Sequence, residues 1–383
     1  MVLRMISYLK NILRNLYVEY SMPISVYDSK ESKDKVLICY IKSPFYLKKR
    51  PIKHCNVFES RIIAKTFYKL GYSVDVVDYR CKRKIDYSKY SIIFGFGLSY
   101  RNVFNESILI KKICYLTGAN PNFSNTQEAL RIKDVFQNKG ILMRPRREAY
   151  WPWMHTAINS DHLIVTGNQF TKKSYNGLNA NISHMPVPFI SSTLNVKSNI
   201  NSNKGFLWFG GAGAIFKGLD LVIDAIDECS EDIKLDICGP IKEEKDFMNY
   251  YDASINKNKN KNKNINFHGM LDVNSHEMGL LVEQNSFVIL PSCSEGGASS
   301  VLTCMNLGLI PIVTKECSIN LDGFGIKIEG FSKEHVLESI ITALSMTDED
   351  IKNQRLLIKS FLKDNHSSKA IEAKFTSILK NII

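Results

Sequence analysis

The sequence predicts an α/β protein of two domains, each built on a parallel sheet, that face each other across a cleft. From Lys35 onward, short apolar runs alternate with helical periods, which is typical of strand–helix–strand units. A segment rich in Ser, Asn and Lys at 191–204 interrupts this pattern. With 383 residues, the chain is long enough for two cores. Because such sheets bind ligands beyond the carboxyl ends of their strands, the cleft is the expected functional site.

The first of these domains is expected at residues 35–190. Buried-type apolar runs predict strands at 36–40, 74–77, 92–96, 113–117, 163–166 and 182–186. Between the first two strands, apolar residues recur at helical spacing up to Gly71, a typical helix stop. Another helix is predicted at 127–137, before Gly140.

The second domain is expected at 205–365, after the linker at 191–204. Strands are predicted at 206–209, 235–238, 265–268, 287–290 and 310–314. Helices are predicted at 217–229, 243–255, 275–285, 299–307, 333–345 and 350–362. The remaining residues, 366–383, contain a helix at 370–379 that we expect to pack back on the first domain.

Composition excludes several classes of protein. The nine cysteines are odd in number and scattered, without a C-x-x-C pair or clustered histidines, which indicates neither disulfides nor a zinc site and favours a reducing cytosol. The formal charge of +12 accompanies a Lys/Asn bias, most evident at 256–264. No basic-aromatic platform or reading helix appears, so we do not expect a nucleic-acid partner.

The N-terminal segment, residues 1–34, is amphipathic. Apolar residues at helical spacing alternate with basic ones: Ile6, Leu9, Leu13 and Leu16 with Arg4, Lys10 and Arg14. Two interpretations stay open, an interfacial helix on an anionic inner membrane and a surface helix packed on the first domain. No apolar stretch is long enough to span a bilayer, so we expect a cytoplasmic protein, peripheral on the membrane under the first interpretation.

Two glycine-rich turns carry the chemistry. The run after the strand at 287–290 contains Glu295 and opens into a helix, whose free N–H groups and dipole suit a phosphate. The turn after the strand at 206–209 ends in Lys217, a cation for a diphosphate. A carboxylate for ligand hydroxyls beside phosphate donors predicts a nucleotide-sugar site. The candidate donor-binding residues are Gly210, Gly211, Gly213, Lys217, Glu295, Gly296, Gly297, Ser299 and Thr303.

These motifs support a specific resemblance. Lys217-Gly218, the turn at 294–297 and the Gly-Leu-Ile-Pro run at 308–311 resemble the donor half of bacterial group 1, or family-4-like, glycosyltransferases of the GT-B class. The stretches at 54–61, 115–120 and 145–147 resemble a subgroup of surface-polysaccharide transferases. The resemblance implies two Rossmann-like domains in the GT-B arrangement. It also implies transfer of a sugar from a nucleoside-diphosphate sugar to a hydroxyl of a lipid-linked glycan, as in a hexosyltransferase.

The sequence departs from the family pattern at two positions. Ala212 stands where the family has an Arg for the diphosphate, and Thr303 where it has a second Glu for the ribose. By analogy Lys217 contacts the phosphates, Glu295 the sugar hydroxyls and Thr303 the ribose. Two alternatives therefore stay open, a nucleotide-sugar epimerase on the same scaffold and a non-catalytic binding relative. No D-x-D carboxylate pair suited to hold Mg²⁺ is evident, so no metal or other cofactor is expected.

Residues of the first domain that lie where a loop enters a helix (54–59) or just after a strand (117–120) are candidates for the acceptor side. They are Asn56, Glu59, Thr117, Gly118 and Asn120, and His54 is a candidate to relay a proton from the attacking hydroxyl, which makes it the third catalytic candidate beside Lys217 and Glu295. For each polar side chain a structural alternative stays open: Asn56 or Asn120 as a cap, Glu59 in a capping box, and His54 as a surface histidine.

One basic cluster and one aromatic cluster have two interpretations each. Arg144, Arg146 and Arg147 form either a solvated face or a site for a phosphorylated lipid acceptor. The aromatic run at 150–153 either packs at a domain edge or stacks against a sugar ring.

Overall fold

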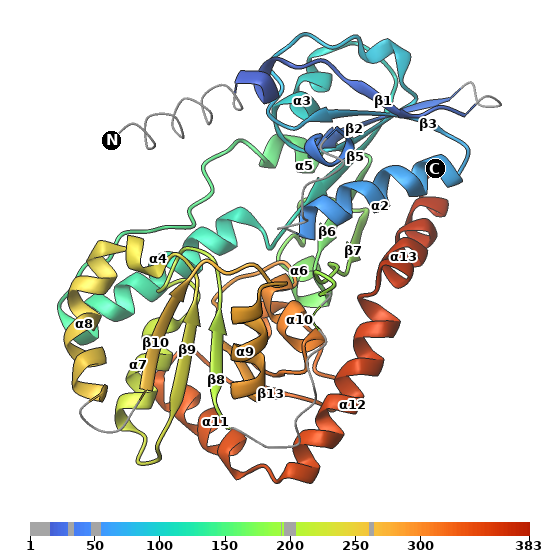
Figure 1. Cartoon of the computed structure of the whole chain (residues 1–383). Helices are drawn as coiled ribbons and strands as arrows, with labels where there is room; N and C mark the ends of the chain where they lie inside the picture. The colour runs from blue at the N-terminus through green and yellow to red at the C-terminus, as the bar shows by residue number, and fades with distance from the viewer. Residues whose placement is uncertain (1–15, 30–33, 47–54, 193, 195–203, 260–263) are drawn as a thin grey trace, which may run out of the picture.

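The structure is a computed structural model that describes residues 16–29, 34–46, 55–192, 194, 204–259 and 264–383. Two α/β domains lie one above the other, each with helices packed on its sheet (Figure 1). The predicted fold class, two Rossmann-like domains facing across a cleft, is confirmed. Residues 1–15, which hold most of the predicted amphipathic helix, and most of the linker at 191–204 lie outside the described residues.

The first sheet has seven strands in the order β1-β3-β2-β4-β5-β6-β7. Each strand predicted in this half is present, and all of these run parallel. The prediction missed β1, a partly exposed edge strand antiparallel to β3, because its four residues make no apolar run. The strands are β1 Ile24–Tyr27, β2 Lys35–Tyr40, β3 Ser73–Asp78, β4 Ile92–Gly95, β5 Lys111–Leu116, β6 His162–Thr166 and β7 Ile182–Met185.

The second sheet has six parallel strands in the order β10-β9-β8-β11-β12-β13. The central strands β8 and β11 are almost wholly apolar and buried, as expected for a sheet covered on both faces. The prediction missed only the three-residue edge strand β13. The strands are β8 Phe206–Phe209, β9 Lys234–Cys238, β10 Asn264–Gly269, β11 Phe287–Leu290, β12 Ile310–Thr314 and β13 Ile326–Ile328.

The predicted helices are present, and the turns of five or six residues at α3, α5 and α6 were not predicted. The helices of the first half are α2 Cys55–Lys69, α3 Gly97–Arg101, α4 Pro121–Lys139, α5 Met154–Asn159 and α6 Gln169–Lys173. Those of the second half are α7 Leu219–Glu228, α8 Lys245–Lys259, α9 His276–Gln284, α10 Ser299–Asn306, α11 Lys333–Ser345, α12 Asp348–Asn365 and α13 Ser368–Lys380.

Two helices pack on a domain other than the one next to them in the sequence. Helix α4 lies between β5 and β6 in sequence, yet Ile132 and Val135 on it belong to the apolar core of the second domain. It reaches down beside α7 and α8 in Figure 1. Helix α13 follows the second domain, and Ile371 and Phe375 on it join the core of the first. Apolar burial on these two helices therefore ties the two domains together.

A buried ion pair adds to the attachment of α4. The Arg131 guanidinium lies 2.5 Å from a carboxylate oxygen of Asp220 at the start of α7, and the two side chains are 3% and 2% exposed. Lys139, at the end of α4, pairs with Asp224 one turn further along α7 and donates to the Tyr251 hydroxyl at 2.8 Å. Because an unpaired charge at this depth is costly, each member of the pair depends on the other.

Replacing Asp220 with alanine should destabilise the protein by about 3–5 kcal/mol, since it leaves the buried Arg131 guanidinium with only the partly exposed Asp134 carboxylate, at 3.4 Å, as a partner. Urea denaturation followed by circular dichroism measures the change. Glu228→Ala, which removes the partner of exposed Lys333, is the matched control and should change stability very little. Equal effects of the two substitutions would show that the Arg131 pair does not hold α4 in place.

Candidate donor site

A cavity of about 380 Å³ lies between the domains, at the carboxyl ends of strands from both sheets. Thr117 follows β5, Gly211 follows β8 and Glu295 follows β11 by one short turn. The first half of the chain contributes Cys55, Asn56, Glu59, Thr117, Arg147, Thr166 and Val187 to its wall. The second half contributes Gly211, Lys217, Glu295, Gly296, Ala298, Ser299 and Ser300.

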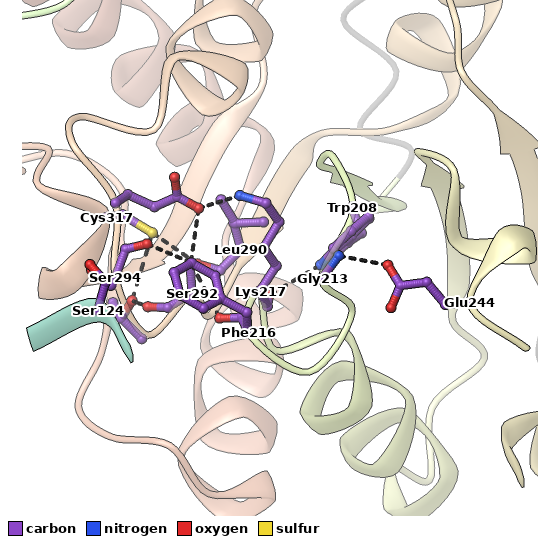
Figure 2. Close-up of polar contacts among 12 residues, drawn as sticks. Ser124, Trp208, Gly213, Phe216, Lys217, Glu244, Leu290, Ser292, Ser294 and Cys317 are labelled. Carbon is purple, nitrogen blue, oxygen red and sulfur yellow. Dashed lines mark hydrogen bonds and ion pairs between the residues drawn. The ribbon is translucent and has the colours of Figure 1, made fainter. Parts of the chain in front are cut away.

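Lys217 and Glu295 form an ion pair at this cavity. The Lys217 ammonium donates to one carboxylate oxygen of Glu295, which also accepts a hydrogen bond from the Ser292 hydroxyl at 2.9 Å. The side chains are 7% and 14% exposed. Figure 2 shows the Lys217 side chain extending from its glycine-rich turn toward the loop that holds Ser292 and Ser294. The two turns that the sequence singled out are thus joined by their two charged residues.

Glu295 stays ionised in this environment. Burial raises the pKa of its carboxyl, but the positive charges of Lys217 and Arg147 and the hydrogen bonds from Lys217 and Ser292 outweigh burial and lower the pKa below its ordinary value of 4.5. A carboxylate that is charged at neutral pH accepts hydrogen bonds and cannot donate them. The group therefore suits ligand hydroxyls.

Glycine permits the position of Lys217. A Cβ on Gly210 would lie 2.7 Å from the Trp208 ring and 3.1 Å from Cδ of Lys217, so a larger residue there would crowd both side chains. Gly213 has a φ of +98° and a Cβ there would lie 2.9 Å from Cγ of Arg147. The turn thus holds one cation of the cavity and makes room for the stem of another.

The amide groups of that turn already have a carboxylate partner. The Gly213 and Ala214 N–H groups donate to the two carboxylate oxygens of Glu244, at 2.6 and 3.1 Å. Glu244 lies on the opposite side of the turn from Ser292 and Ser294 (Figure 2) and is 5% exposed. These two amides are therefore not free to bind a phosphate, contrary to the expectation for Gly213.

The N-terminus of α10 opens toward the cavity. Ala298 occupies its N-cap without a side chain that could accept from the first turn, and Ser299 and Ser300 line the cavity. An uncapped helix start with its dipole aimed at a cavity favours an anion.

Thr303 does not face the cavity, contrary to the expected ribose contact. It is 1% exposed, and its hydroxyl donates to the Ser299 carbonyl and accepts from the Ile190 N–H.

The domains meet backbone to backbone beside the cavity. A Cβ on Gly296 would lie 2.5 Å from Cα of Gly118, and one on Gly297 would lie 2.9 Å from the Val187 side chain. Glycines at these two positions therefore allow the donor turn to touch the first domain. This contact and a positive φ both favour glycine at 297, whereas at Gly118 only the positive φ does, because a Cβ there would meet no atom within 4 Å.

The acceptor-side candidates separate into two groups. Asn56, Glu59 and Thr117 line the cavity. Glu59 is nevertheless 2% exposed and accepts a hydrogen bond from the Tyr40 hydroxyl at 2.6 Å. Asn120 caps α4 by accepting from the Asn122 N–H at 2.9 Å, which confirms the structural alternative for that residue. His54 lies outside the described residues.

The cysteines near the cavity are protonated thiols rather than nucleophilic thiolates. Cys55 lines the cavity and contacts the Ser299 hydroxyl at 3.1 Å across the domain boundary. Burial raises its pKa to about 11 and also raises the pKa of Cys293. Neither is deprotonated at neutral pH.

Sequence reasoning missed three residues of the site: Ser292, Glu244 and Arg147. Ser292 and Glu244 carry no motif of their own, because tertiary contacts alone bring them to the turns. Arg147 was recognised only as one of a basic cluster and as part of the stretch at 145–147. In the structure Arg146 pairs with Asp246, whereas Arg147 lines the cavity.

Among the described residues, no group of three or more His, Cys, Asp and Glu side chains is arranged to hold a metal ion. Likewise, none of the helices in the described part of the chain has the length and apolar character that a membrane span requires.

Similarity to known proteins agrees with this geometry. Residues 191–381 match the family "Glycosyl transferases group 1". No curated protein matches the sequence significantly. The fold is similar to that of sucrose-phosphate synthase from Thermosynechococcus elongatus (TM-score 0.62, 10% identity, 91% of this chain and 99% of that one). A glycosyltransferase from Rickettsia africae is also similar (TM-score 0.61, 13% identity, 92% of this chain and 99% of that one). So is Anabaena Alr3699/HepE in complex with UDP-glucose (TM-score 0.59, 12% identity, 91% of this chain and 99% of that one).

The fold and the cavity at its centre define a two-domain glycosyltransferase of the GT-B class. Within that class the chain belongs to the group 1 glycosyltransferases, and the matched region contains both donor turns.

The Lys217–Glu295 pair predicts a pH-dependent difference in stability between the native protein and Glu295→Gln. At about pH 7 the variant should be about 1–3 kcal/mol less stable, because the Lys217 charge loses its buried partner. The pKa of Glu295 in the folded protein lies below its ordinary value of 4.5. The stability that the ion pair contributes is therefore present above pH 4.5 and is lost as the pH falls through the folded-state pKa. Urea denaturation between about pH 7 and about pH 2.5 spans the pH range in which the difference is lost and tests this. A difference that grows on acidification would contradict the assigned charge state.

Proposed function

We propose that this glycosyltransferase moves a sugar from a nucleoside-diphosphate sugar to a hydroxyl of a lipid-linked glycan in cell-surface polysaccharide synthesis. The observation that carries the donor assignment is the buried Lys217–Glu295 pair at the uncapped start of α10. It places a cation and helix amides beside a carboxylate, which are the groups that a diphosphate and sugar hydroxyls require.

Bond cleavage at the anomeric carbon places negative charge on the leaving diphosphate. Lys217 and the N–H groups at the start of α10 are fixed before the reaction and meet that charge as it develops. Lys217 leaves Glu295 in part and binds a phosphate oxygen, while Glu295 accepts from sugar hydroxyls. Neither role needs a metal ion, and we propose that the reaction proceeds without one.

The acceptor would enter from the first domain. Thr117 is exposed and Asn56 half-buried, and both line the same cavity as Lys217 and Glu295. A hydroxyl held there faces the sugar that Glu295 binds. A lipid-linked acceptor is supported by the resemblance of 54–61, 115–120 and 145–147 to surface-polysaccharide transferases.

Related structures support the donor class. Anabaena Alr3699/HepE, similar in fold, is known in complex with UDP-glucose and in complex with UDP. For the present chain, the proposal extends to a nucleoside-diphosphate sugar, with UDP, GDP, CDP and ADP as the nucleotides to compare.

Lys217→Ala and Glu295→Gln should separate the two halves of the donor. Lys217→Ala should weaken binding of the nucleoside diphosphate by about tenfold or more, because a charge-assisted contact to phosphate is lost. Glu295→Gln should retain the diphosphate but lose the preference for its sugar conjugate. Isothermal titration calorimetry with each of the four nucleotides measures both effects. A native protein that binds none of the nucleotides or conjugates would refute the proposed donor.

Turnover should persist in EDTA, with nucleoside diphosphate released only when an acceptor is supplied. The released nucleotide can be quantified by a coupled assay. Loss of activity in EDTA would refute the metal-independent mechanism. Conversion of the donor sugar without an acceptor would instead indicate an epimerase.

A further inference from the structure

The loop between α4 and α5 brings Arg147 to the donor cavity. Arg147 lines the cavity with Lys217 and Glu295, and its positive charge contributes to the lowered pKa of Glu295. Its guanidinium carbon lies 5.8 Å from the centre of the ring of Phe216, the residue that precedes Lys217. Two cations therefore flank Phe216 and face the same cavity.

The loop that carries Arg147 is held on the second domain. The Glu128 carboxylate on α4 accepts from the Arg146 N–H at 2.7 Å and the Arg147 N–H at 3.0 Å. Asp246 on α8 accepts from the Arg144 N–H at 2.9 Å and pairs with the Arg146 side chain. Since α4 itself packs in the core of the second domain, the loop contacts hold Arg147 on that domain, although Arg147 precedes it in the sequence.

Arg147 differs from its basic neighbour in the charges around it. Arg146 has a carboxylate partner in Asp246, whereas Arg147 forms no ion pair with any described carboxylate. The neighbouring turn supplies little further positive potential, because Glu244 occupies the Gly213 and Ala214 amides. Ala212 contributes no charge either. A diphosphate near this turn would thus meet two side-chain cations, Lys217 and Arg147.

We propose that Arg147 binds the donor diphosphate together with Lys217, as a cation supplied by the first half of the chain. This inference rests on the proposed function, since it assumes a nucleoside-diphosphate donor in the cavity. The planar guanidinium offers paired N–H donors that match two phosphate oxygens, which an ammonium cannot do. Gly213 is part of the arrangement, because a Cβ there would displace the Arg147 stem.

Calorimetry on Arg147→Ala, Arg147→Lys and Arg144→Ala tests the proposal. The titrants are the nucleoside diphosphate that binds the native protein most tightly and the corresponding nucleoside. Arg144→Ala is the matched control, since it removes the same charge from the same exposed loop. Arg147→Ala should weaken diphosphate binding by about ten- to hundredfold and leave nucleoside binding unchanged. Arg147→Lys should recover part of the loss, and Arg144→Ala should match the native protein.

The outcomes separate two failures. If the native protein binds no nucleoside diphosphate, the proposed function fails and the inference with it. If the native protein binds one and Lys217→Ala weakens it, but Arg147→Ala binds as tightly as Arg144→Ala, the donor site stands and Arg147 is not part of it. Equal losses for nucleoside and diphosphate with Arg147→Ala would also overturn the inference, because they would indicate a displaced loop.

Discussion

The ion pair between Lys217 and Glu295 is the interaction on which the donor site depends. A lysine side chain that is only 7% exposed holds its charge at a cost unless a counter-charge lies nearby, and Glu295 supplies that counter-charge from the facing turn. The pair fixes the distance between the two turns before any ligand arrives. A phosphate must then compete with Glu295 for Lys217, so binding exchanges one ion pair for another. Much of the affinity for a phosphate must therefore come from groups whose charge is not already neutralised.

Helix α4 determines which groups those are. Its apolar side belongs to the second core and its Arg131 is buried against Asp220, so residues after α4 are held on the donor domain although the chain then returns to the first sheet. Glu128 extends this attachment to the backbone of the following loop. Dividing the chain at the linker near 191–204 therefore separates the two sheets, but it leaves α4 and the loop after it, which are held on the second domain, with the first half of the sequence. Arg147 is close to Lys217 for this reason.

The sequence was sufficient for both sheets and for the pairing of the two turns, because buried parallel strands and glycine-rich helix starts have local signatures. What it could not show depends on tertiary contacts. Nothing local indicates that Glu244 takes the Gly213 amide, that Thr303 is bound to backbone at 190 and 299, or that α4 crosses to the other core. The edge strand β1 was missed because its partly exposed residues lack an apolar period.

The same contacts determine where the two domains can separate at least cost. The two domains are also joined by single polar contacts, such as Cys55 with Ser299 at the cavity and Asn168 with Asn320 outside it, each worth about 1 kcal/mol net. Helix α4 is instead held to the second domain by apolar burial and the Arg131–Asp220 pair. Parting the sheets would break these polar contacts first. Arg147 would then remain beside Lys217, while the acceptor wall at Asn56 and Thr117 moved away with the first sheet.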